Sequence, residues 1–159
     1  FHPKLPFLAN GSFEESLIIY DLTMSPPIIK HHLAFQKHRI DSIAFHPSLP
    51  LVVFCSYSTS LTIYNMSTSP MTCEHCLYYE PKFIVSVAFH GTFPLLAVGI
   101  SDNSIFIYDI STSKPPIITN YFNRQFYGTA MAFHPIFPLF ATSLKNGKIF
   151  LYNVEKMRI

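Results

Sequence analysis

Residues 43–65 read IAFHPSLPLVVFCSYSTSLTIYN, and nearly the same pattern occurs four times along the chain. It consists of an aromatic–His–Pro turn, an apolar run, a Ser/Thr patch and an alternating segment that ends in Tyr-Asn. Successive copies are offset by 44 residues with no gap, which predicts an internal repeat. The shared positions are Phe1, Phe45, Phe89 and Phe133; His2, His46, His90 and His134; Pro6, Pro50, Pro94 and Pro138; and Tyr20, Tyr64, Tyr108 and Tyr152.

Each repeat divides into short strand-like segments separated by polar or proline-containing turns. In the second repeat they are DSIAFH (41–46), LPLVVFCSY (49–57), LTIYN (61–65) and TCEHCLYYE (72–80). The second segment is nearly all apolar, as expected for a strand buried on both faces. No window shows a 3.6-residue period. The sequence therefore predicts an all-β fold with fourteen strands, arranged as three, four, four and three.

Four strands in 44 residues match the spacing of β-propeller blades. The third copy, VAFHGTFPLLAVGISDNSIFIYDI (87–110), resembles a WD repeat. The resemblance covers nearly the whole chain. It implies that Asp102 holds the turn between the second and third strands. It also implies that Tyr108-Asp109 stands where the family usually has Trp-Asp.

The repeats depart from this family's pattern in ways that affect their hydrogen bonding. There is no tryptophan, and only the third copy has the turn aspartate, while Asn146-Gly147 replaces it in the fourth. The Gly-His pair that normally opens a repeat is missing, and His38 is the nearest substitute. The family's usual His–Ser–Trp–Asp network cannot form, so the blades are expected to rely on packing.

Residues 1–159 are predicted to form one propeller segment, with units that start near residues 1, 45, 89 and 133 and with incomplete terminal blades. Rings of this family usually have seven or eight blades. Three explanations stay open: an excerpt of a longer propeller, two chains that complete one ring, or a closed four-bladed ring. A row of blades that stayed open would leave unpaired sheet edges at both ends, which folded proteins avoid.

The composition excludes several classes of function. Apolar residues make up 49% of the chain and charged residues only 13%, against about 25% in an average soluble domain. A net charge of +2 with dispersed basic residues argues against nucleic acid and anionic membranes as partners. The apolar runs are too short to span a bilayer, and no signal peptide is recognisable. Three cysteines give no disulfide framework, which indicates a reducing, cytoplasmic location, although the sequons at Asn10 and Asn65 argue weakly against it.

Two motifs suggest metal binding, and both have simpler explanations. Zinc ligands must converge within a few ångströms, whereas histidines repeated in every blade should lie far apart and bond to the backbone of their turns. Cys73 and Cys76 flank His75, but no second ligand pair exists. Repeat alignment places Cys73 opposite Ile29, which predicts a buried apolar position, and Cys76 at an outward polar one. No metal or cofactor is expected.

The acidic residues do not suggest a catalytic site. Glu14-Glu15 is the only adjacent pair, and Asp21 and Asp109 occupy equivalent repeat positions, which indicates a structural role. There is no glycine-rich phosphate loop. We therefore expect no enzyme activity from these residues.

Family analogy predicts a non-enzymatic scaffold that binds other proteins, because a fold alone does not fix function. The segments that differ between copies, 30–39, 73–82 and 120–128, are rich in aromatics and histidine and suit protein contact. Two alternatives stay open: a structural subunit of a coat, axoneme or ribosome-associated assembly, and an enzyme or ligand-binding propeller whose site lies on residues absent here. Self-association or further blades would close the ring. The candidate contact residues are His31, His32, Tyr78, Tyr79, Tyr121 and Arg124.

Overall fold

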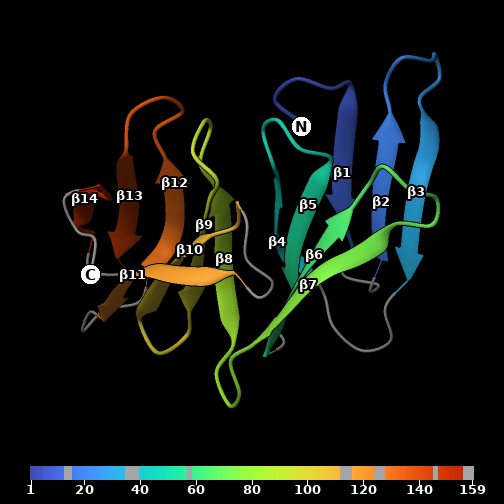
Figure 1. Cartoon of the computed structure of the whole chain (residues 1–159). Coiled ribbons are helices and arrows are strands. Elements are labelled where there is room, and N and C mark those ends of the chain that lie inside the picture. Colours follow the sequence, from blue (N-terminus) through green and yellow to red (C-terminus); the bar gives the residue numbers. More distant parts are fainter. Residues whose placement is uncertain are drawn as a thin grey trace.

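A computed structural model describes residues 1–12, 16–34, 40–56, 59–111, 116–123, 128–144 and 147–155. This part of the chain forms fourteen antiparallel strands in four sheets, with no helix (Figure 1). It therefore has no helix that could cross a membrane. The predicted all-β class and the strand grouping of three, four, four and three are confirmed.

Each sheet is a run of consecutive strands, paired in chain order. The first sheet holds β1 (Phe7–Gly11), β2 (Ser16–Asp21) and β3 (Ile28–Ala34). The second holds β4 (Ile40–Phe45), β5 (Leu51–Ser56), β6 (Ser60–Asn65) and β7 (Thr72–Tyr78). The third holds β8 (Ile84–Phe89), β9 (Leu95–Ile100), β10 (Ser104–Asp109) and β11 (Ile117–Asn123). The fourth holds β12 (Gly128–Phe133), β13 (Leu139–Leu144) and β14 (Ile149–Asn153).

The sheets stack side by side as propeller blades do, but they do not close a ring in this chain (Figure 1). The extensive contacts between sheets, such as β4 with β8 and β8 with β12, join consecutive sheets. The first and fourth sheets lie at opposite ends of the row. The alternative of a closed four-bladed ring is therefore wrong for this structure.

The apolar side chains of each sheet are buried against the next sheet. One cluster joins Leu17 and Ile19 of the first sheet to Val52 of the second. Equivalent clusters join the second sheet to the third and the third to the fourth, where Phe140 is completely buried. Since a single sheet cannot cover its own faces, the repeat of core positions along the sequence follows from this stacking.

The shared histidine organises the turn between the first and second strand of each repeat. Its Nδ1 accepts hydrogen bonds from the backbone N–H groups two and three residues later, at 2.9–3.2 Å. The ring also packs on the shared phenylalanine of the following repeat, with ring centroids 5.2, 5.1 and 5.2 Å apart at the three junctions. Phe1 makes no such contact and is 85% exposed.

The shared proline ends this turn. The strands β1, β5, β9 and β13 begin directly after it, where its missing N–H interrupts no ladder. The residue before each proline accepts a hydrogen bond from the residue after it at 2.7–2.8 Å, which is the pattern of a γ-turn centred on proline. Because all four turns are alike, they point the same way in every repeat.

Candidate protein-interaction site

The four histidine turns lie at the same end of the sheets, at the top of Figure 1. In every turn a large apolar side chain is exposed at the repeat position directly before the proline, and the fourth turn also exposes Ile136. We call this set the apolar arc: it comprises Leu5, Leu49, Phe93 and Phe137, which are 43%, 44%, 36% and 57% exposed. The arc was not predicted from the sequence, although its 44-residue spacing could have revealed it.

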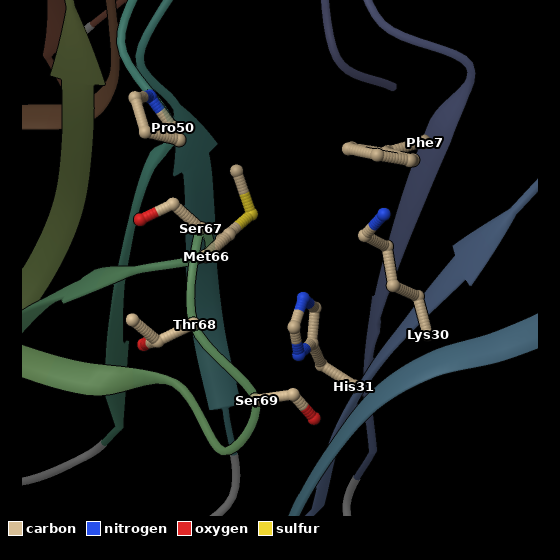
Figure 2. A pocket seen from close by; sticks show the side chains of 8 residues that line it. All are labelled: Phe7, Lys30, His31, Pro50, Met66, Ser67, Thr68 and Ser69. Atoms are coloured by element: carbon tan, nitrogen blue, oxygen red, sulfur yellow. The ribbon is translucent and has the colours of Figure 1, made fainter.

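A groove opens between the first and second sheets near the same end of the molecule (Figure 2). Its volume is about 470 Å³, within the range of ligand-binding clefts. The first sheet contributes Phe7, Lys30 and His31, and the second contributes Pro50 and the loop 66–69. We call this space the inter-sheet groove.

Lys30 and His31 supply the polar groups on the first-sheet side of the groove. Lys30 Nζ lies 4.5 Å from the centroid of the Phe7 ring and 4.0 Å from the nearest carboxylate oxygen of Asp21. The His31 side chain is only 7% exposed, and its Nε2 has no hydrogen-bond partner. Burial lowers the pKa of His31, Lys30 lowers it further, and a hydrogen bond to the backbone of Met66 opposes both.

The other predicted contact residues do not gather at one place. His32 and Tyr78 are exposed, Tyr78 by 73%. Tyr79 instead donates a 2.7 Å hydrogen bond from its hydroxyl to the Tyr108 hydroxyl of the neighbouring sheet. The backbone of Tyr121 lies in β11, and Arg124 lies outside the described residues.

The repeat-equivalent acids and amides that follow the shared tyrosines all form turns. In each repeat the side-chain oxygen accepts the backbone N–H two residues later, at 2.8–3.1 Å. This interaction needs only an acceptor, so aspartate and asparagine alternate freely. The four residues are Asp21, Asn65, Asp109 and Asn153.

Asp102 lies in the turn between β9 and β10. Its carboxylate accepts a 3.0 Å hydrogen bond from Ser104 N and pairs with Lys82. Burial would raise the pKa of Asp102, but these hydrogen bonds outweigh it and the pKa is lowered. Gly147, in the corresponding turn of the fourth repeat, has a φ of +81°, a conformation that favours glycine, while its neighbour Asn146 lies outside the described residues.

The cysteines do not form a metal site with their neighbours. Among the described residues, no group of three or more His, Cys, Asp or Glu side chains could hold a metal ion. The expectation that Cys73 is buried is wrong: Cys73 and Cys76 are both exposed, because β7 is the outermost strand of its sheet. Ile29, at the position equivalent to Cys73, is likewise 56% exposed, so an apolar residue there does not indicate burial.

Acidification is expected to destabilise the fold through His46. Burial is the main reason why its pKa falls from 6.5 to about 4, with a smaller effect of His2. The unfolded chain therefore binds more protons between pH 6.5 and 4. His46 contributes stability that is fully present above pH 6.5 and is lost as the pH falls toward 4, by up to about 3 kcal/mol.

Urea unfolding at several pH values between 7.5 and 4.5 checks this prediction. The matched variant His46→Asn keeps an acceptor near the Nδ1 position but cannot titrate. It should be less stable than the wild type at pH 7.5 and show a flatter pH dependence. Parallel curves for the two proteins would contradict the assignment to His46. Asp21 and Asp102, whose pKa values are lowered from 3.8, affect stability only at lower pH.

One segment of this chain matches a known protein family. Residues 71–109 match the family described as WD domain, G-beta repeat. The matched segment runs from β7 through β10, so it links the outer strand of one sheet to the first three strands of the next. A search of the curated proteins found no match. WD repeats generally occur in proteins that act as protein–protein interaction scaffolds, and the four sheets are consistent with such repeats.

Proposed function

We propose that this chain, with a WD repeat at residues 71–109 and four blade-like sheets, is a non-enzymatic scaffold that docks other proteins on its turn-bearing face. The observation that carries the proposal is the apolar arc. Four large apolar side chains are exposed at equivalent positions on one end of the molecule. Exposed apolar groups gathered on one face are typical of protein interfaces.

The surroundings of the arc support a protein partner. The segments that carry the arc, 46–50, 90–94 and 134–138, contain no Lys, Arg, Asp or Glu, and only Lys4 lies beside the first arc residue. Interface cores are depleted in charge and enriched in aromatic residues, and the segments that carry the arc combine few charged residues with Phe93 and Phe137. A nucleic acid or an anionic membrane would require a basic face instead.

The cellular location that we propose is the cytoplasm. Cys55, Cys73 and Cys76 are all free thiols, and the last two are exposed. Unpaired exposed thiols suit a reducing compartment.

Charged substitutions in the arc are expected to abolish partner binding without unfolding the protein. The double variant Leu49→Asp/Phe93→Asp should reduce partner capture at least tenfold, because each carboxylate would be desolvated at an apolar interface. Affinity capture from extracts of the source cells, followed by titration with the purified partner, measures this loss.

The control for this experiment is Ile149→Asp. Ile149 is 71% exposed but lies at the opposite end of its sheet from the histidine turn. It should leave capture unchanged, and circular dichroism should show that both variants keep the fold. Equal capture by the wild type and the arc variant would reject the apolar arc as the docking surface.

A further inference from the structure

The positive charge that Lys30 gives to the inter-sheet groove is not repeated at the equivalent positions of the second and third repeats. Lys30 and His31 correspond to Glu74 and His75 in the second repeat. In the third repeat the same positions are Ile118 and Thr119. The core positions repeat and the lysine does not, so Lys30 is a specialised feature of the first sheet rather than part of the blade framework. The histidine is shared with the second repeat.

A β-bulge brings Lys30 and His31 to the same groove. Along β3, His31 lies opposite Ile19 and Ile29 lies opposite Tyr20, so Lys30 has no partner across the strand pair. Consecutive residues of a regular strand point to opposite faces, whereas a bulge redirects one of them. Figure 2 shows both side chains reaching into the space that faces the loop 66–69 of the second sheet.

One buried polar atom of the groove lining, His31 Nε2, has no hydrogen-bond partner. The Met66 backbone contact raises the His31 pKa, as expected when a ring N–H donates to a carbonyl oxygen. Because Nε2 has no partner, the donor in this contact is Nδ1. In Figure 2 the ring nitrogen farther from the backbone, which is Nε2, points between Met66 and Lys30. A buried polar atom without a partner is costly, and most such atoms in folded proteins are satisfied.

We propose that the inter-sheet groove binds the carboxylate of a glutamate or aspartate side chain of a partner protein, held by Lys30 Nζ and by a protonated His31 Nε2. The inference rests on the proposed scaffold function and names the chemistry that one of its contacts recognises. Phe7 and Met66 form apolar walls that suit the CH₂ stem of the acid. Nε2 is shielded from solvent, and Met66, which lies beside it in Figure 2, is only 4% exposed, so the Met66 side chain must move when the ligand enters.

The charge of the groove favours a carboxylate over a phosphate. Its lining holds one lysine and one histidine and no arginine, and Asp21 lies next to the lysine. A phosphate dianion would need more positive charge and more donors than these. Loop 66–69 and Pro50 supply no titratable side chain, so Lys30, His31 and Asp21 set the electrostatics of the site.

Binding should take up a proton. In the neutral ring Nδ1 carries the hydrogen and Nε2 is an acceptor, and a carboxylate is also only an acceptor. The complex therefore requires protonation of Nε2, which raises the pKa of His31 above its value in the free protein. Affinity is greatest below the free pKa and is lost as the pH rises through the pKa of the complex. Between these two pKa values the affinity falls about tenfold per pH unit.

The test uses the whole chain and two capped peptides, acetyl-Gly-Glu-Gly-amide and its glutamine analogue. Nitrogen-15 NMR of the imidazole measures the protonation and tautomer of His31 in titrations from pH 5.5 to 7.5. We expect the glutamate peptide to bind at least tenfold more tightly than the glutamine peptide and to raise the His31 pKa. Lys30→Met should weaken binding about tenfold, and His31→Asn should remove its pH dependence. The control is Glu74→Gln, at the position equivalent to Lys30 in the second repeat. It should change neither the affinity for the glutamate peptide nor its pH dependence.

The other outcomes contradict the proposal that the inter-sheet groove binds a carboxylate. Equal binding of the two peptides, or no binding of either, removes the carboxylate site. Tighter binding of inorganic phosphate than of the glutamate peptide makes it a phosphate site instead. The proposed docking surface fails separately: arc variants that retain the partner reject the apolar arc even if the peptide binds in the groove. Conversely, the arc variants could lose the partner while Lys30→Met keeps it. The scaffold proposal would then stand, but the inter-sheet groove would not be part of the interface.

Discussion

Replacing His90 with alanine should lower the free energy of unfolding by about 3–5 kcal/mol, because one buried ring satisfies three backbone groups. Its Nδ1 accepts hydrogen bonds from Thr92 N and Phe93 N at 3.0 and 3.1 Å. Its Nε2 lies 2.9 Å from the Phe137 carbonyl oxygen in the next sheet. Since Nδ1 is an acceptor, the hydrogen of the neutral ring is on Nε2, which donates to this carbonyl. The ring is fully buried.

The matched control is His134→Ala. His134 makes the same two Nδ1 contacts within its turn, at 3.1 and 3.0 Å, but it is only half-buried. Water can replace its ring, so we expect a loss of about 1 kcal/mol. Denaturant unfolding of both variants gives the comparison, and His90→Asn, which keeps an acceptor near Nδ1, should fall between them. Equal losses for the two alanine variants would show that the hydrogen bond between sheets contributes nothing.

Strand positions could be predicted from the sequence because burial and turns leave local signals. The run LVVF at 51–54 and its equivalent at 95–98 lie in the middle of their sheets and are largely buried on both faces. Prolines mark the strand starts because a missing N–H is tolerated there. These signals repeat at a fixed interval, so a weak indication in one copy is reinforced by the others.

The location of individual side chains on the outer strands could not be predicted in this way. Cys73 and Ile29 are exposed although the pattern is apolar, because exposure there depends on strand order and on what covers the sheet edge. Lys30 and His31 share the inter-sheet groove only because of a bulge, and a simple alternating pattern would place them on opposite faces. Register shifts depend on the pairing of two strands and leave no clear mark in either one.

One sequence feature could have indicated the close contact between the third and fourth sheets. The third repeat has Gly91 where the other copies have Pro3, Pro47 and Pro135. A Cβ atom on Gly91 would lie 2.1 Å from the carbonyl oxygen of Pro135, which belongs to the turn of the next repeat. The turns approach closely at this junction, where Phe137 of the same turn also accepts the hydrogen bond from His90.

The substitution Gly91→Pro, which restores the residue of the other repeats, should therefore destabilise the protein by about 2–4 kcal/mol. A proline normally stabilises a compatible turn by restricting the unfolded chain, by up to about 1 kcal/mol. Here the Cβ contact is far below van der Waals distance and the obstacle is backbone, so the fourth-sheet turn must move. That movement would also stretch the contact between His90 and Phe137, so the losses of Gly91→Pro and His90→Ala should be less than additive in the double variant.

Thermal and denaturant unfolding of Gly91→Pro and Gly91→Ala should show losses of similar size, because both add the same Cβ atom. Pro47, at the equivalent position of the second repeat, already has a Cβ atom. Pro47→Ala should therefore change the free energy of unfolding by less than about 1 kcal/mol. A stabilising Gly91→Pro would mean that the junction between the third and fourth sheets tolerates a Cβ atom at this position. The glycine would then have no role in bringing the two turns together.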